Sequence, residues 1–247
     1  GLLDIILHPD FRENRLIYMT YAWGDESANR TQAARARYAD GSLSELEVIY
    51  ATNVTKNGTQ HFGSRLVWLP DKTLLISVGD GGNPPVSLDG TYIRNWAQSL
   101  KYQLGSIVRV NADGSIPEDN PFTGRENASP GIYTLGHRNI QGLAVDPLRN
   151  TVWATEHGAL GGDELNRVRK GGNYGWPEYT YSREYSSGVR IAESGTSPDT
   201  VSPLLVWMSA IAPSGLTVLT SDRYSDWKGD LFAGALVKQS VQHIKLD

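Results

Sequence analysis

The chain contains 247 residues, of which 39% are hydrophobic, and carries a formal net charge of −4 at pH 7. This charge gives no overall attraction to nucleic acid or to an anionic membrane, and no apolar run approaches the ~20 residues that a membrane-spanning helix needs. Because the sequence has no cysteine, disulfides, thiolate-bound metals and thiol nucleophiles are excluded within it.

A single unit recurs four times along the chain. Each copy has an apolar strand, a turn with Pro or Asp, a second apolar strand, a variable insertion and a third strand of alternating polarity. Anchored on Pro9, Pro70, Pro147 and Thr220, the copies follow at intervals of 61, 77 and 73 residues. The predicted strand segments are 1–11, 16–22 and 34–42; 61–71, 73–80 and 105–115; 138–147, 151–158 and 163–173; and 212–222, 229–238 and 239–247.

Repeated units of three or four strands, without heptads or amphipathic helices between them, predict an all-β fold of the β-propeller type. A β-sandwich is the alternative, but it would not explain four similar copies. Segments 82–100 and 112–130 are rich in Pro, Asn, Gly and Ser and are interpreted as loops on one blade. The sequence opens directly on a strand-like segment, so we expect residues 1–247 to be one propeller domain that is incomplete at both ends.

Polar side chains gather where the predicted strands begin and end. His61, Arg138 and Asn139 enter first strands, and residues 80, 157–158 and 238 leave second strands. Adjacent strands in a blade are antiparallel, so these positions share one end of the propeller. Glu164, which enters a third strand, belongs to the same end.

Each of these residues also has an ordinary structural interpretation. His61 alone would be a hydrogen-bonded structural histidine, Arg138 a surface ion pair, Lys238 a solvated lysine, and Asp163 with Glu164 the cap of a turn. Convergence of polar residues at equivalent positions in successive copies favours a site instead. The fourth copy has Ile211, Ala212 and Pro213 at the equivalent place.

The residue types limit the chemistry of such a site. Arg and Lys bind carboxylates or phosphates, and Glu164 together with the turn at 171–175 could supply oxygen ligands for Ca²⁺. A histidine such as His61 can remove a hydroxyl proton. Neither GxGxxG after a strand nor GxxxxGK[ST] occurs, so nucleotide cofactors have no support. These groups suit a bound anionic cofactor better than simple hydrolysis.

The motifs of this chain resemble those of the glucose/sorbosone dehydrogenase family, which consists of six-bladed propellers and includes aldose sugar dehydrogenases that use pyrroloquinoline quinone (PQQ) and Ca²⁺. The resemblance covers nearly the whole chain and implies an oxidoreductase that oxidises the C1 hydroxyl of aldoses to the lactone by hydride transfer to PQQ. The motifs are GLLDIILHPDF, HFGSRL, GHRNIQGLAVDP, EHGALGGDELNRVRKGGNYGWP and KGDLFAGALVKQSVQHIKLD.

The same resemblance implies roles for individual residues. His61 would be the general base that takes the proton of the C1 hydroxyl. Four residues would bind the cofactor, namely Arg138, Asn139, His157 and Lys238. Four would bind calcium: the carbonyls of Gly158 and Ala159 at the cofactor's Ca²⁺, and Glu164 with the carbonyl of Tyr174 at a second Ca²⁺. A periplasmic or secreted location and an unidentified electron acceptor are implied as well.

The sequence departs from the family pattern at three points. A glutamine would precede Gly1, further basic contacts to the quinone would follow Asp247, and Ala159 replaces a common proline. We therefore expect the full-length protein to be the enzyme and the 247-residue piece alone to be weak or inactive. Two alternatives stay open: a non-catalytic propeller that serves as a binding module, and a calcium-dependent propeller lactonase.

Overall fold

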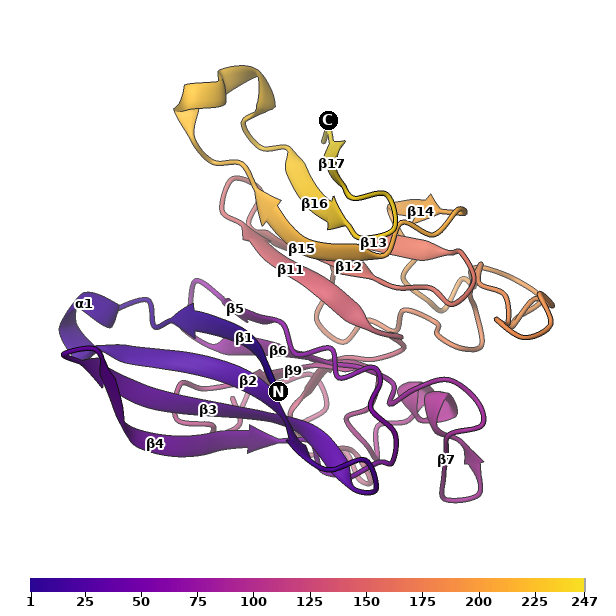
Figure 1. Ribbon diagram of the computed structural model, residues 1–247, viewed down its shortest axis with the longest axis horizontal. Coiled ribbons are helices and arrows are strands. Elements are labelled where there is room, and N and C mark those ends of the chain that lie inside the picture. Colours follow the sequence, from indigo (N-terminus) through magenta and orange to yellow (C-terminus); the bar gives the residue numbers. More distant parts are fainter. Residues whose placement is uncertain (247) are drawn as a thin grey trace.

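The computed structural model describes residues 1–246, and its four main sheets are the blades of a β-propeller (Figure 1). Blade 1 contains β1 (Leu2–Leu7), β2 (Leu16–Gly24), β3 (Asn29–Ala39) and β4 (Ser42–Ala51), and blade 2 contains β5 (Leu66–Trp68), β6 (Leu74–Val78), β9 (Ser106–Val110) and β10 (Ile132–Thr134). Blade 3 contains β11 (Ile140–Asp146), β12 (Thr151–Glu156), β13 (Asp163–Val168) and β14 (Leu205–Trp207), and blade 4 contains β15 (Pro213–Val218), β16 (Leu231–Ala235) and β17 (Ser240–Ile244).

The predicted all-β propeller is confirmed, and the named strand segments coincide with the first three strands of each blade. The fourth strands of blades 1 to 3 were not located. The first seven residues of β4 are exposed, and the sequence of this part does not show a clear apolar period. β10 and β14 have three residues each and follow long insertions, which leaves too few positions for an alternating pattern.

Helical structure is confined to connections. α1 (Phe11–Asn14) lies between β1 and β2, and the 3₁₀ segment η2 (Asp222–Trp227) lies between β15 and β16. The predicted loop at 82–100 holds a small hairpin of β7 (Ser87–Leu88) and β8 (Thr91–Tyr92), followed by the 3₁₀ segment η1 (Ile93–Gln98). No helix within residues 1–246 is long and apolar enough to cross a membrane.

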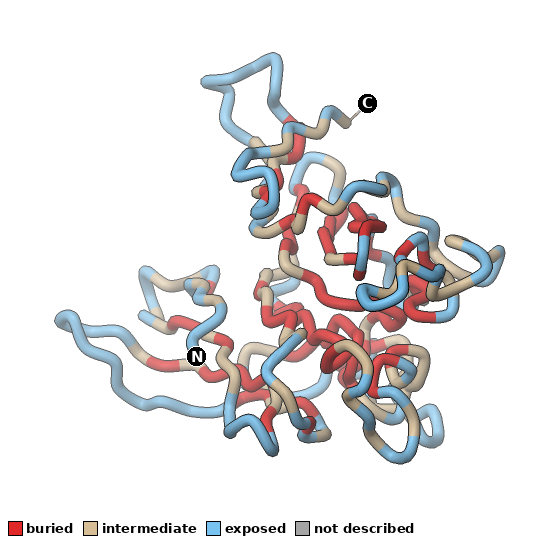
Figure 2. Tube along the Cα trace, turned by 45° about the vertical axis from the view of Figure 1, so that its right-hand side comes forward, coloured by how far each residue is buried: buried red, intermediate tan, exposed pale blue. Residues whose placement is uncertain are grey.

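The blades pack face to face through the period-2 alternation of their middle strands. In β6, Leu74 and Ile76 belong to the core shared with blade 1, whereas Leu75 between them belongs to the core shared with blade 3. All five residues of β6 are buried, since both of its faces are covered. Figure 2 shows the buried trace running through the middle of the molecule. First strands of neighbouring blades contact one another, so they are the innermost strands.

Asp163, at the start of β13, fastens blade 3 to blade 4. Its side chain is 1% exposed, and one carboxylate oxygen accepts a hydrogen bond from the backbone N–H of Gly158 at 2.8 Å. The other oxygen accepts from the N–H groups of Ile211 and Ala212 at 2.7 and 2.9 Å. These two residues enter blade 4, so a single carboxylate satisfies three backbone donors from two blades.

We expect Asp163→Ala to lower the free energy of unfolding by about 3 kcal/mol or more, because three buried donors lose their acceptor at about 1–3 kcal/mol each. Urea unfolding followed by tryptophan fluorescence measures the change. Asp199→Ala is the control, since Asp199 is exposed. A loss of unfolding free energy below about 1 kcal/mol for Asp163→Ala would show that the three hydrogen bonds of Asp163 are not needed to hold blades 3 and 4 together.

Candidate active site at the mouth of the propeller

His61 and Asp80 form a hydrogen-bonding contact at one end of blade 2. The His61 Nδ1 atom lies 2.6 Å from Oδ1 of Asp80, whose side chain is fully buried. His61 has a left-handed backbone with φ of 51°, which is costly for a non-glycine residue and is typical of functional sites. A Cβ atom at Gly79 would collide with the carbonyl oxygen of His61, so glycine at position 79 is what admits this backbone approach.

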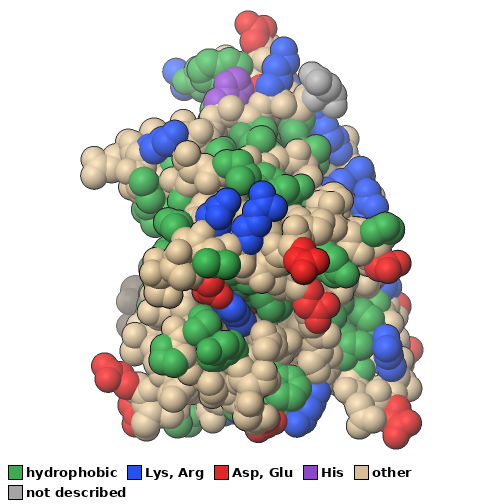
Figure 3. Space-filling model, turned by 90° about the vertical axis from the view of Figure 1, so that its right-hand side faces the viewer, with side chains coloured by type: hydrophobic (Ala, Val, Ile, Leu, Met, Phe, Trp, Pro, Cys, Tyr) green, Lys and Arg blue, Asp and Glu red, His purple; other side chains and the backbone are tan. Residues whose placement is uncertain are grey.

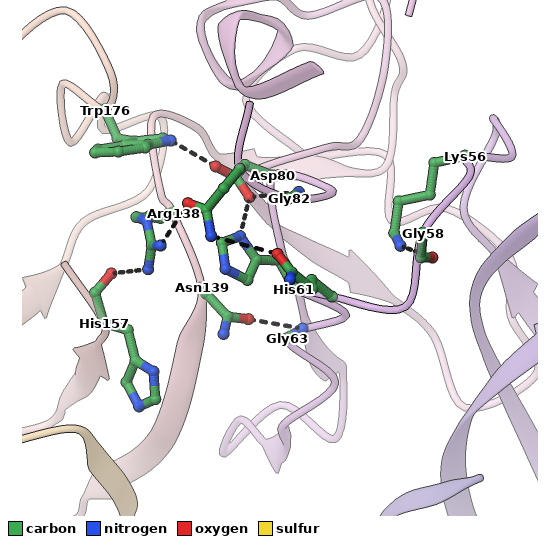
Figure 4. A network of polar contacts seen from close by, with 12 residues as sticks. Lys56, Gly58, His61, Gly63, Asp80, Gly82, Arg138, Asn139, His157 and Trp176 are labelled. Atoms are coloured by element: carbon green, nitrogen blue, oxygen red, sulfur yellow. Dashed lines mark hydrogen bonds and ion pairs between the residues drawn. The ribbon is translucent and has the colours of Figure 1, made fainter. Parts of the chain in front are cut away.

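Arg138, which enters blade 3, reaches the same place. The carbonyl oxygen of Arg138 accepts a hydrogen bond from the N–H of Asp80 at 2.8 Å. Its guanidinium donates to the carbonyl of His157 (Figure 4). It also donates to the carbonyl of Gly158 and to Oδ1 of Asn83. Arg138 is 3% exposed, and its Nε atom is buried without a partner. The structure therefore brings His61 and Arg138 into one network through Asp80.

No carboxylate within residues 1–246 forms a salt bridge with the side chain of Arg138, although the side chains of Arg35, Arg94 and Arg109 all have one. A buried cation without a counter-ion is unfavourable unless an anion supplies the missing charge. On the face that carries the inserted loops, basic and acidic side chains are interspersed (Figure 3). The attraction for an anionic ligand would thus come from Arg138 itself.

Two predicted cofactor contacts have other partners. Oδ1 of Asn139 accepts hydrogen bonds from the N–H of Gly63 and from Nε2 of Gln141, both at 3.1 Å. The imidazole of His157 points away from Arg138 (Figure 4) and donates from Nε2 to the carbonyl of Pro213 at 2.8 Å. Burial lowers the pKa of His157. What His157 offers to Arg138 is its carbonyl oxygen.

A small cavity of about 10 Å³ lies beside the Arg138 guanidinium, with three of the four predicted calcium ligands in its lining, Gly158, Glu164 and Tyr174. This volume accommodates one water-sized particle. The fourth, Ala159, is buried next to Gly158, and its N–H donates to Oγ of Ser182. No cluster of three His, Cys, Asp or Glu side chains occurs in the part of the chain that is described, so a cation here would depend on carbonyl oxygens.

Glu164 has an unusual electrostatic environment. Burial, and after it the negative charge of Glu156, raises the pKa of Glu164 to about 8. Nδ2 of Asn166 donates to both carboxylates, at 2.9 Å to Glu156 and 3.1 Å to Glu164. Glu156 is further held by Nδ1 of His137 at 2.8 Å. Glu164 is thus a carboxyl without a cationic partner among residues 1–246.

Lys238 lies in the turn between β16 and β17 and is exposed. The N–H groups of Leu236 and Val237 donate to the carbonyls of Ala212 and Ile211. Asp163 accepts from the N–H groups of Ile211 and Ala212 and also from that of Gly158. The turn that carries Lys238 therefore lies at the same end of the blades as Gly158.

Sequence reasoning missed two members of the network. Trp176 donates from Nε1 to Oδ2 of Asp80 at 2.8 Å, and Asn83 accepts from Arg138 at 2.9 Å. Both come from loops, where no strand period marks a functional position. Asp80 carried a signal, because it is aligned with His157 in the internal repeat, but no role in holding His61 was inferred for it.

The fold and the site define a β-propeller whose mouth holds a histidine hydrogen-bonded to a buried aspartate, beside an arginine that has no carboxylate partner within residues 1–246. Comparison with known proteins gives the family. The model of the Glucose / Sorbosone dehydrogenase family matches residues 1–247, and the chain belongs to this family. The predicted family resemblance is therefore confirmed.

Two curated relatives are an uncharacterised protein of Synechocystis, 54% identical over the whole chain, and an aldose sugar dehydrogenase of Escherichia coli, 35% identical over 98% of the chain. The chain spans 60% and 63% of the length of these relatives.

Among solved structures, a glucose dehydrogenase superposes with a TM-score of 0.92 at 33% identity, covering all of this chain and 70% of its own. The PQQ-bound aldose sugar dehydrogenase of Streptomyces coelicolor superposes with a TM-score of 0.76 at 28% identity, covering all of this chain and 63% of its own.

The environment of Glu164 makes the stability of the metal-free protein depend on pH. The folded-state pKa of about 8 lies above the ordinary value of 4.5, so the contribution of Glu164 is complete below about pH 4.5 and is lost as the pH rises through about 8. We expect Glu164→Gln, which resembles the protonated carboxyl, to reduce the fall in unfolding free energy between about pH 5 and about pH 9. Urea unfolding in the presence of a chelator measures this fall.

Glu193→Gln is the control for this experiment, because Glu193 is exposed and its substitution should leave the pH dependence as it is in the wild type. An equally steep fall in Glu164→Gln and in the wild type would contradict the assignment of a protonated, buried Glu164.

Proposed function

We propose that this protein is a PQQ-dependent aldose dehydrogenase that oxidises the C1 hydroxyl of a sugar to the lactone. The observation that carries the proposal is the buried guanidinium of Arg138, which has an unpartnered Nε atom and lies in one network with the His61–Asp80 pair. The family match and the similarity to a PQQ-bound relative support the same chemistry.

His61 would be the general base. A carboxylate only accepts hydrogen bonds, so the contact of 2.6 Å with Asp80 requires the proton of the neutral imidazole to be on Nδ1. This leaves the lone pair on Nε2, which can take the proton of the sugar's C1 hydroxyl. Asp80 would also stabilise the imidazolium that forms, as a buried carboxylate does in hydrolase triads.

The cofactor fits the charges of the mouth. PQQ is a tricarboxylate, and a planar guanidinium can bind a carboxylate in bidentate fashion. Arg138 would bind it, with Lys238 as a second cation at the same end of the blades and Asn139 beside it. When bound, PQQ supplies the acceptor for the hydride that leaves C1 of the sugar.

We assign the carbonyls of Gly158 and Ala159 to the Ca²⁺ of the cofactor, and Glu164 with the carbonyl of Tyr174 to a second Ca²⁺. Hard cations prefer carboxylate and carbonyl oxygens, and the small cavity is lined by Gly158, Glu164 and Tyr174. A divalent cation there would balance the adjacent carboxylates of Glu156 and Glu164. His157 would contribute through its carbonyl rather than its imidazole.

We also propose a periplasmic or secreted location, which is implied by the family resemblance. The electron acceptor that reoxidises the cofactor is left open.

The direct test is to reconstitute the full-length protein with PQQ and Ca²⁺. Reduction of an electron-accepting dye is then measured with a panel of aldoses. We expect dye reduction only when PQQ, Ca²⁺ and an aldose are all present. We expect His61→Ala to lower the rate of turnover roughly 100-fold or more. PQQ binding, measured by calorimetry, should stay close to the wild-type value because Arg138 is unchanged.

His243→Ala is a matched control for this substitution. Nε2 of His243 also lies 2.6 Å from an aspartate, Asp230, but His243 is on β17, outside the mouth. Its substitution should leave turnover intact. Normal turnover in His61→Ala would remove the base assignment, and absence of turnover in the loaded wild type with every aldose would remove the proposed function.

A further inference from the structure

The second oxygen of the buried Asp80 carboxylate is held by a tryptophan. Oδ1 contacts Nδ1 of His61 at 2.6 Å and accepts from the N–H of Gly82 at 3.1 Å. Oδ2 accepts from Nε1 of Trp176 at 2.8 Å (Figure 4). A buried carboxylate is stable only when it is paired and hydrogen-bonded. The indole N–H thus fixes the oxygen that His61 does not contact.

Trp176 is itself fixed on several sides. It is 4% exposed, its backbone N–H donates to the carbonyl of Gly136 at 2.9 Å, and its backbone carbonyl accepts from Nε2 of Gln98 at 2.8 Å. The guanidinium groups of Arg138 and Arg94 lie 5.4 and 5.9 Å from the centre of its ring, within the range of cation–π attraction. The indole therefore presents its N–H to Asp80 from a constrained position.

We propose that Trp176 is a positioning residue for the base of the reaction. By anchoring one oxygen of Asp80, it keeps the other oxygen aligned with Nδ1 of His61, which leaves Nε2 unprotonated and directed at the substrate. This inference rests on the proposed function, because it assigns Trp176 a part in the proton transfer by His61.

Removing the indole N–H would leave Oδ2 of Asp80 buried without a donor. The carboxylate would then rotate or admit water to regain a hydrogen bond, because an unsatisfied buried acceptor is costly. His61 would lose its fixed acceptor and would populate the tautomer with the proton on Nε2. In that tautomer the imidazole cannot accept the proton of the C1 hydroxyl.

Trp176→Phe tests the proposal, since it keeps an aromatic ring and removes only the donor. In the enzyme loaded with PQQ and Ca²⁺ we expect kcat to fall roughly 10- to 100-fold, by analogy with the loss of a group that orients a metal-bound histidine, with KM for the sugar changed less than about twofold. The matched control is Trp153→Phe. Trp153 is also buried and donates to an aspartate, Asp146, at 3.3 Å, but at the opposite end of blade 3, so kcat should stay at the wild-type value.

A second measurement does not depend on turnover. In the cofactor-free protein labelled with ¹⁵N-histidine, we expect the wild type to show His61 protonated on Nδ1 alone. Trp176→Phe should show a mixture of tautomers at His61, whereas Trp153→Phe should resemble the wild type. Unchanged His61 nitrogen shifts together with an unchanged kcat in Trp176→Phe would overturn the proposal.

The two measurements separate this inference from the proposed function. A loaded wild-type protein that oxidises no sugar removes the function, while the tautomer of His61 still reports whether Trp176 positions it. If Trp176→Phe does not fold, the indole N–H resonance of Trp176 in His61→Ala decides instead. A shift of that resonance supports the coupling through Asp80, and an unchanged resonance overturns it.

Discussion

The mouth of this propeller depends on the pairing of one buried negative charge, the carboxylate of Asp80. It binds His61 ahead of the first strand of blade 2 and Trp176 in the loop between β13 and β14 of blade 3, while the backbone N–H of Asp80 binds the carbonyl of Arg138. Since leaving such a charge unpaired in the interior is very costly, these contacts fix segments from two blades relative to each other. The candidate base is positioned as a consequence.

Two other ionisable groups in the mouth have no oppositely charged partner among the described residues. Arg138 has no carboxylate partner among the described residues. Burial, and after it the charge of Glu156, raises the pKa of Glu164 to about 8. Buried polar groups are normally satisfied, so exceptions call for an explanation. An anionic cofactor and a cation would satisfy both groups together, which is the physical basis of the proposed function.

Most of the scaffold could be predicted because the blades repeat a period-2 pattern. β6, for instance, alternates residues toward blades 1 and 3, and its sequence is apolar except for Ser77, as expected for a strand covered on both sides. The short outer strands β10 and β14 could not be predicted, because three residues do not define a period.

The site was predictable to the extent that strand ends determine it. His61 and Arg138 precede the first strands of blades 2 and 3, Gly158 follows the second strand of blade 3, and antiparallel pairing places them at one end. Trp176 and Asn83 were missed because their positions depend on how long loops fold back over the mouth. The direction of the His157 imidazole could not be predicted either, since it follows from a contact with Pro213 of blade 4.

The central claim is that the mouth is a site for an anionic quinone beside a histidine base. A crystal structure of the protein with PQQ and Ca²⁺ tests it most directly. We expect electron density for PQQ in contact with the Arg138 guanidinium, with Nε2 of His61 facing the space where the sugar binds. Density for PQQ elsewhere on the propeller, with Arg138 still donating to the carbonyl of Gly158 as it does here, would contradict it.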